Sequence, residues 1–280
     1  MKSIWAHVLV KNEERYVWYA VTSVIDFVDK VLLWDTGSTD KTPRIIKEIQ
    51  KRYPGKIDFK EFGEVTPQGY TDLRQKMLEE TTSDWFMILD GDEVWWEESI
   101  KEVVRRIQEK GDRMESVVVR MVLPIGDIYH YQEEEAGMYK IDGRVGHLTI
   151  RFINRSIPGL YTAKPHGQHG YYDENNILIQ GRTPAKRMFV DRSYMHLTHL
   201  IRSSGLMEDR KVPKRDIKYK YELGRPFPKD FYFPEVFFRP KPEIVASSWG
   251  RMSAKFFSRA LIETPLRKIK RRIYKRRIGY

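Results

Sequence analysis

The feature that most constrains the fold is the regular alternation of short apolar runs with helix-length amphipathic stretches over the first 123 residues. Strands are expected at residues 4–10, 31–34, 57–62, 85–89 and 116–123. Helices are expected at residues 13–27, 43–53, 70–81 and 97–110. This alternation is typical of βαβ units, and it predicts an open, mostly parallel α/β sheet with helices on both faces. Ligands of such sheets bind beyond the carboxyl ends of the strands.

The pattern weakens after residue 123, where a region rich in Gly, Tyr and His follows, with one further strand expected at 148–154. We interpret residues 1–212 as one domain with halves 1–123 and 124–212. Residues 213–280 form an extension rich in aromatic residues and Pro, which ends in a basic amphipathic tail at 260–280. Its aromatic side chains either cover the core or form a platform for sugar rings.

Acidic residues follow two of the expected strands. Asp90 and Asp92 flank Gly91 directly after the apolar run WFMIL. Two carboxylates separated by a glycine can bind one hard cation and leave room for a ligand, although the same pattern also occurs in turns and helix caps. We take Asp92 to be a surface carboxylate. Asp35, at the tip of the second strand, is placed either to cap a turn or to bind a nucleoside.

Several classes of protein are excluded by what the sequence lacks. It contains no Cys, which rules out disulfides, zinc-thiolate and iron–sulfur sites, and cysteine nucleophiles. The phosphate loops GxxxxGK[ST] and GxGxxG are missing, which argues against a kinase or a dehydrogenase. No apolar run is long enough to span a bilayer, and the N-terminus leads into a strand pattern instead of a signal peptide. We expect a cytoplasmic protein.

Four segments carry a resemblance to a known family. They are HVLVKNEE (7–14), VLLWDTGSTDKT (31–42), YTDLRQKMLEETTSDW (70–85) and FMILDGDEVW (86–95). In this order they resemble the landmarks of family 2 glycosyltransferases of the GT-A fold. The resemblance implies a GT-A nucleotide-binding sheet and a UDP- or GDP-sugar donor. It also implies a Mn²⁺ or Mg²⁺ ion and inverting transfer to a hydroxyl of a glycan or lipid-linked acceptor.

The same resemblance assigns roles to individual residues of the first half. Val10 and Lys11 would line the base pocket, and Asp35 would contact the nucleoside. Arg74, alternatively a solvated helix residue, would reach the nucleotide or its diphosphate. In the last motif, Asp90 and Gly91 would bind the ribose or diphosphate, and Asp92 with Asp90 the metal. Thr36 stands where many relatives have a second acid.

The second half matches the family less closely. His166 and Gln168 fall where relatives place an acceptor-side loop, and His196 falls where they place a third metal ligand, although a lone His is usually a packed or solvated residue. Gly167 replaces the expected carboxylate. Candidates for the catalytic base are therefore Asp173 first, then Asp142 and Asp127, each of which could be an ordinary loop acid.

Two other functions remain open. A sugar nucleotidyltransferase of related fold would need a Gly-rich loop after the first strand, where this chain has Lys11-Asn12-Glu13-Glu14. A non-catalytic polyanion-binding module would rely on the basic tail, but it would leave the acids of the strand ends unexplained.

Basic charge is concentrated at the C-terminus. The net charge of the chain is +11, but residues 265–280 contain eight Lys and Arg and no acid, which leaves a net charge of only +3 for residues 1–264. A nearly neutral body argues against nucleic acid as a partner. In the tail, Ile262, Leu266, Ile269 and Ile273 form one helical stripe. Such a helix can lie on an anionic membrane, here the inner face, bind a polyanion or dock on its own domain.

Overall fold

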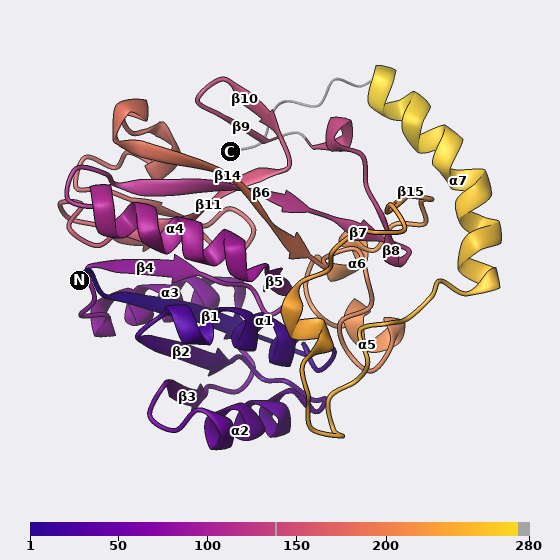
Figure 1. Ribbon diagram of the computed structural model, residues 1–280, viewed down its shortest axis with the longest axis horizontal. Helices are drawn as coiled ribbons and strands as arrows, with labels where there is room; N and C mark the ends of the chain where they lie inside the picture. Colours follow the sequence, from indigo (N-terminus) through magenta and orange to yellow (C-terminus); the bar gives the residue numbers. More distant parts are fainter. Residues whose placement is uncertain (138, 274–280) are drawn as a thin grey trace.

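The computed structural model describes residues 1–137 and 139–273 of the chain. Its centre is an eight-stranded sheet with helices on both faces (Figure 1). The strand order is β3 (Ile57–Glu61), β2 (Lys30–Asp35), β1 (Ile4–Val10), β4 (Trp85–Ile88), β11 (Leu148–Asn154), β6 (Ser116–Val122), β14 (Arg187–His196) and β5 (Glu93–Trp95).

Strands β1 to β4 pair in parallel, β11 is inserted antiparallel between β4 and β6, and β14 runs parallel to β6. The last strand, β5, pairs antiparallel with β14. The helices are α1 (Val17–Val24), α2 (Thr42–Arg52), α3 (Pro67–Glu80), α4 (Glu97–Lys110), α5 (Leu206–Arg210), α6 (Arg215–Lys218) and α7 (Ala254–Ile273). This mostly parallel α/β sheet with flanking helices confirms the predicted GT-A type of fold.

Shorter elements decorate the sheet. The 3₁₀ helices are η1 (Ile25–Phe27), η2 (Glu134–Ala136), η3 (Ile179–Gly181), η4 (Pro184–Lys186) and η5 (Glu235–Phe238). Small sheets pair β9 (Tyr139–Ile141) with β10 (Arg144–Gly146), β12 (Tyr161–Ala163) with β13 (Gly170–Tyr172), and β8 (Asp127–Tyr131) with β7 (Pro124–Ile125) and β15 (Arg225–Pro226).

The alternation of side chains along β1 divides the core between the two faces of the sheet. Val8 and Val10 belong to the largest buried cluster, which packs under α1, α2 and α4. Leu9 points to the other face, where it packs with Leu73 and Met77 of α3. Because a strand buried on both faces cannot alternate apolar with polar residues, β1 is apolar except for His7, which is buried beside Thr81.

One helix and one strand differ from the sequence prediction. Helix α1 begins at Val17 instead of residue 13, because the Glu13 carbonyl accepts the amides of Tyr16 and Val17 in a turn. The ten-residue strand β14 was not predicted. Its apolar pattern is interrupted by Asp191 and Arg192, and its register with β6 shifts at this point.

The C-terminal extension shares the core of the preceding domain. Val236, Phe237 and Val245 belong to the largest buried cluster, and Phe227, Phe231 and Phe233 pack against it. Helix α7 lies along one side of the molecule (Figure 1). Within the described ranges, no helix is long and apolar enough to cross a membrane.

Candidate active site

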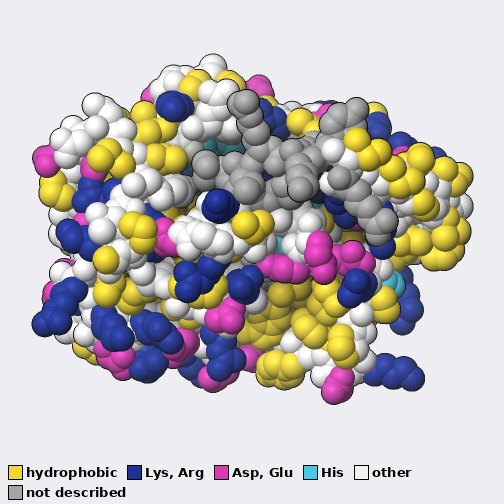
Figure 2. All heavy atoms as spheres, turned by 90° about the horizontal axis from the view of Figure 1, so that it is seen from above, with side chains coloured by type: hydrophobic (Ala, Val, Ile, Leu, Met, Phe, Trp, Pro, Cys, Tyr) yellow, Lys and Arg dark blue, Asp and Glu magenta, His cyan; other side chains and the backbone are white. Residues whose placement is uncertain are grey.

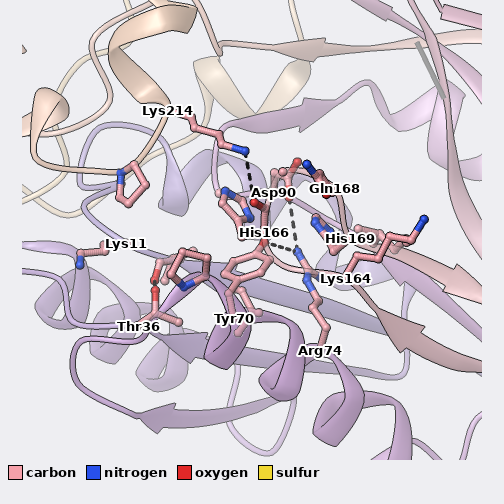
Figure 3. A pocket seen from close by; sticks show the side chains of 18 of the residues that line it. Lys11, Thr36, Tyr70, Arg74, Asp90, Lys164, His166, Gln168, His169 and Lys214 are labelled. Atoms are coloured by element: carbon pink, nitrogen blue, oxygen red, sulfur yellow. Dashed lines mark hydrogen bonds and ion pairs between the residues drawn. The ribbon is translucent and has the colours of Figure 1, made fainter.

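A cavity of about 750 Å³ opens at the carboxyl ends of β1 and β4. It is bounded on one side by α3 and the segment 164–172, and on the other by residues 212–218 around α6. Figure 3 shows the side chains of α3 pointing into it beneath the loop that carries His166 to His169. The site therefore lies where open α/β sheets bind their ligands.

The cavity has a marked excess of positive charge. Among its described lining residues are eight Lys and Arg side chains but only four Asp and Glu. The body of the chain is nearly neutral, so the excess belongs to this site. A cavity of this charge suits a polyanionic ligand such as a diphosphate.

Asp90 lies between two arginines at the end of β4. Its Oδ1 is 3.5 Å from Arg74 Nη2 of α3, and its Oδ2 is 3.2 Å from Arg151 Nη2 of β11. Burial opposes ionisation of this carboxyl group, but Arg151 and Arg74 outweigh it and lower the pKa of Asp90 to about 2. Asp90 is thus a carboxylate at any physiological pH, and it remains 36% exposed toward the cavity.

Asp92 is fully buried, which corrects the expectation of a surface carboxylate. Its Oδ2 accepts a 2.7 Å hydrogen bond from Arg202 Nη1, and the same nitrogen lies 3.2 Å from Glu13 Oε1. Burial works against the charge of Asp92, yet Arg202 and His196 hold its pKa well below the usual range. Arg215 also pairs with Glu13, at 2.6 Å, and so extends this buried network into α6.

Three side chains are arranged as a candidate divalent-cation site. Asp90, Glu93 and His196 each offer one ligand atom, and these atoms lie within 4.8 Å of one another. His196 Nε2 is 3.5 Å from Asp92 Oδ1. Both Asp92 Oδ1 and His196 Nδ1 are buried without a hydrogen-bond partner among the described residues. Carboxylates suit Mn²⁺ and Mg²⁺, and imidazole is a ligand of transition metals rather than of Mg²⁺, so these residues fit Mn²⁺ better than Mg²⁺.

The predicted nucleoside residues lie at the ends of β1 and β2. Asp35 Oδ1 accepts the amides of Gly37 and Ser38 at 3.0 and 2.8 Å, which makes it a turn cap, while its Oδ2 is buried without a partner in the described structure. Val10, Lys11 and Thr36 line the cavity, and Asp35 lies behind them. Gly91 packs closely on Val10 and Glu13, where an added Cβ would come within 3.0 Å of both side chains.

The three acids predicted as candidate bases are not among the described residues that line the cavity. Asp173 is buried, accepts the amides of Asn175 and Ile177, and pairs with Arg182. Asp142 pairs with Arg187. Asp127 Oδ1 accepts the Tyr129 amide at 2.9 Å and lies 2.6 Å from His130 Nδ1. By contrast, His166 and Gln168 do line the cavity.

Several residues of the site were not found from the sequence. Glu93 was overlooked although it directly follows Asp92. Arg151 could have been suspected, because it interrupts the apolar strand LTIRFIN. Arg202 and Lys218 come from irregular sequence that carries no periodic signal, and Arg202 lies 110 positions from its partner Asp92.

The mostly parallel sheet with helices on both faces has the GT-A type of fold. The chain belongs to glycosyl transferase family 2, because the model of the family described as "Glycosyl transferase family 2" matches residues 6–164, more than half of the chain.

Individual relatives are distant. The glycosyltransferase SunS of the SPβ prophage of Bacillus subtilis is 24% identical over 195 residues, which cover 64% of this chain and 43% of that protein. A TPR repeat-containing protein of Synechococcus elongatus is 23% identical over 180 residues, 64% of this chain and 38% of that protein. The chain thus spans about two fifths of the length of these curated relatives. The crystal structure of S. aureus TarS 1–349 matches with a TM-score of 0.50 and 13% identity, covering 70% of this chain and 60% of that one.

The buried pair of Asp92 and Arg202 generates a prediction about stability. We expect Arg202→Met to lower the free energy of unfolding by about 3 to 5 kcal/mol, because it leaves Asp92 buried without its closest cation. Urea denaturation of the variant measures this loss. Adding Asp92→Asn to Arg202→Met should recover part of it, since the unpaired charge is then removed.

The matched control is Lys211→Met, which breaks an exposed pair with Glu208 and should change the free energy of unfolding by no more than about 0.5 kcal/mol. If Arg202→Met is as stable as this control, the pair does not support the fold.

Proposed function

We propose that the protein is a metal-dependent, inverting glycosyltransferase that moves a sugar from a UDP- or GDP-sugar to an acceptor hydroxyl. The observation that carries this proposal is the placement of Asp90, Glu93 and His196 within 4.8 Å of one another at the edge of a strongly cationic cavity. Membership of glycosyl transferase family 2 supports it.

The donor would lie across the ends of β1 and β4. Its nucleoside would contact Val10 and Lys11, which line the cavity. Asp35 lies outside the described lining, so its buried, unpartnered Oδ2 would accept a hydrogen bond from the nucleoside only after the turn at residues 36–38 has moved aside. Its diphosphate would lie near Arg74 and the cation held by Asp90, Asp92 and His196, with Glu93 as an added ligand. Gly91, between the two aspartates, is buried and packs on Val10 and Glu13, where a side chain would not fit.

The chemistry explains why the cavity is cationic. As the glycosidic bond to phosphate breaks, negative charge accumulates on the departing nucleoside diphosphate. Arg74, Arg202 and Lys218 line the same cavity and can stabilise this charge. A bound divalent cation would add Lewis-acid stabilisation of the same oxygens. Inversion needs a base on the acceptor side but no second carboxylic acid at the leaving group.

The alternatives are less well supported. A sugar nucleotidyltransferase would need a Gly-rich loop after β1, where the chain instead continues into Lys11, Asn12 and the buried Glu13. A polyanion-binding module would place its basic residues on an open face, whereas eight of them here line a cavity.

Ligand-induced stabilisation tests the donor site. We expect UDP or GDP with Mn²⁺ to raise the melting temperature, and EDTA to remove most of that shift, because a ligand that binds only the folded state stabilises it.

Asp35→Asn tests the nucleoside contact. This change keeps the oxygen that caps the turn but replaces the oxygen that has no partner with an amide nitrogen. We expect this change to weaken binding of the preferred nucleotide by about 1.5 to 3 kcal/mol, measured by calorimetry.

Asp58→Asn, on the neighbouring strand β3 and outside the cavity lining, is the matched control and should bind as the parent does. Unchanged affinity in Asp35→Asn would show that Asp35 only caps its turn. No shift with either nucleotide and Mn²⁺ would contradict the proposed donor site.

We further propose that α7 attaches the enzyme to an anionic membrane surface. The helix packs on the body through the buried residues Phe256, Ala260 and Thr264. Its large apolar residues point the other way: Ile262, Leu266, Ile269 and Ile273 are 71, 62, 52 and 69% exposed. Hydrophobic side chains gather at the edge of the molecule where α7 lies (Figure 2). Such a patch marks an interaction surface.

Exposed Lys and Arg side chains near this apolar stripe favour an anionic partner. Lys255, Arg259, Lys268 and Lys270 are exposed on the same helix. Lys275, Arg276 and Arg277 of the predicted tail lie outside the described residues. An apolar stripe bordered by Lys and Arg is typical of helices that lie on anionic lipid. Because α7 lies on the side toward which the parallel strands point (Figure 1), attachment would bring the site near a lipid-linked acceptor.

Vesicle co-sedimentation tests this attachment. Leu266→Asp with Ile269→Asp should abolish binding to phosphatidylserine vesicles without disturbing the packed face of α7. Binding by the parent should weaken as salt increases, since each basic residue near the surface contributes about 1 kcal/mol of screened attraction.

The control carries the same change of charge elsewhere: Met207→Asp with Ile177→Asp, two exposed apolar residues outside α7. If both double variants bind vesicles equally well, α7 is not the attachment surface. If the parent instead dimerises through α7 and ignores vesicles, the stripe is a protein interface.

A further inference from the structure

The carboxylates of the cavity are all engaged by cations. Glu13 and Asp92 share Arg202, and Asp90 lies between Arg74 and Arg151. Glu64, the fourth acid of the described lining, is largely exposed and pairs with Lys11 at the nucleoside end. The proton acceptor for the incoming hydroxyl must therefore be sought among other groups.

The loop at 164–169 brings two histidines into the cavity and fixes them to the first turns of α3. The His166 amide donates to Pro67 O at 2.9 Å, and Thr71 Oγ1 donates to Lys164 O at 2.6 Å. Gly167 has φ +88°, and a Cβ there would meet Lys214 Nζ at 2.0 Å. The positive φ explains why glycine stands where a carboxylate was expected, because side chains are strained in this conformation, whereas the end of the flexible Lys214 side chain could move aside.

A chain of contacts joins His166 to the donor side of the site. Its ring lies 4.3 Å from the ring of Tyr70. The Tyr70 hydroxyl accepts a 3.0 Å hydrogen bond from Arg74 Nη2, which is the nitrogen that reaches Asp90. Figure 3 shows the His166 ring next to Tyr70. His166 Nδ1 is buried and has no hydrogen-bond partner among the described residues.

We propose that His166 is the general base of the transfer reaction, an inference that rests on the proposed glycosyltransferase function. Its imidazole takes the proton of the acceptor hydroxyl as that oxygen forms a bond to the anomeric carbon. The bond from this carbon to the phosphate oxygen breaks, and its electron pair leaves with the nucleoside diphosphate. The imidazolium then releases its proton to solvent.

The surroundings of His166 keep its ring neutral and able to accept a proton. Burial lowers its pKa, and the cations Lys218, Arg74 and Lys214 act in the same direction, while Asp90 opposes them. Tyr70 and His169 are its ring neighbours, with His169 stacked at 5.7 Å. Burial and the Arg74 charge lower the pKa of His169 to about 4, which makes it the weaker base.

Hydrolysis of the donor provides an acceptor-independent test, because the same base would activate water. The readout is release of nucleoside diphosphate from UDP-glucose, UDP-N-acetylglucosamine or GDP-mannose with Mn²⁺, using the donor that the parent hydrolyses fastest. We expect His166→Gln to lower kcat by roughly 10² to 10⁴-fold and to leave the dissociation constant for UDP or GDP within about twofold. The acid limb of kcat/KM in the parent, expected below pH 6.5, should disappear.

His130→Gln is the control for the substitution itself, because His130 lies outside the cavity lining, and it should retain parental kcat. Added imidazole should partly restore kcat of His166→Ala, which a merely structural role would not allow.

The proposal fails if His166→Gln keeps kcat within about tenfold of the parent or retains the acid limb. It also fails if His169→Gln, and not His166→Gln, removes that limb. Either result would leave the glycosyltransferase proposal standing as long as the parent binds UDP or GDP with Mn²⁺. A parent that binds neither would overturn the proposed function itself.

Discussion

A network of buried, paired charges joins the parallel strands of the sheet to the segment that follows β14. Arg202 and Arg215, from the segment after β14, reach across to Glu13 and Asp92 at the ends of the parallel strands. Removing such charges from water costs several kcal/mol for each ion, and each partner is tolerated only while the other is present. The position of α6, and with it one wall of the cavity, therefore depends on the acids of the sheet.

The same network supplies positive charge to the cavity while keeping most of the charged groups buried and paired. Arg202 and Arg215 pair with Glu13. Arg74 and Arg151 pair with Asp90. Most of the positive charge of the cavity is thus held close to acids. Preorganised charges of this kind need little rearrangement when negative charge develops on a leaving group. Stability and chemistry thus draw on the same side chains.

Much of the fold could be predicted from the sequence because β1, β2 and β4 are mainly apolar, buried runs with helical periodicity between them. β14 could not, because Asp191 and Arg192 break its pattern where the ladder shifts register. Asp90 and Asp92 were found as a pair, but the burial of Asp92 depends on Arg202, which no local signal connects to it. In α7 the stripe was predicted, whereas the packed face is made of Phe256 and the small residues Ala260 and Thr264.

Helix α3 links the two ends of the cavity. Its first turn holds the His166 loop at Pro67, and Arg74, seven positions further, reaches Asp90 on the donor side. With a rise of 1.5 Å per residue, these points are separated by about 10 Å along one rigid rod. In the proposed reaction, the spacing between the donor side and the acceptor side would thus be set by helical register. Loops around the cavity can vary in length, but an insertion between Pro67 and Arg74 would rotate one half of the site by about 100° relative to the other.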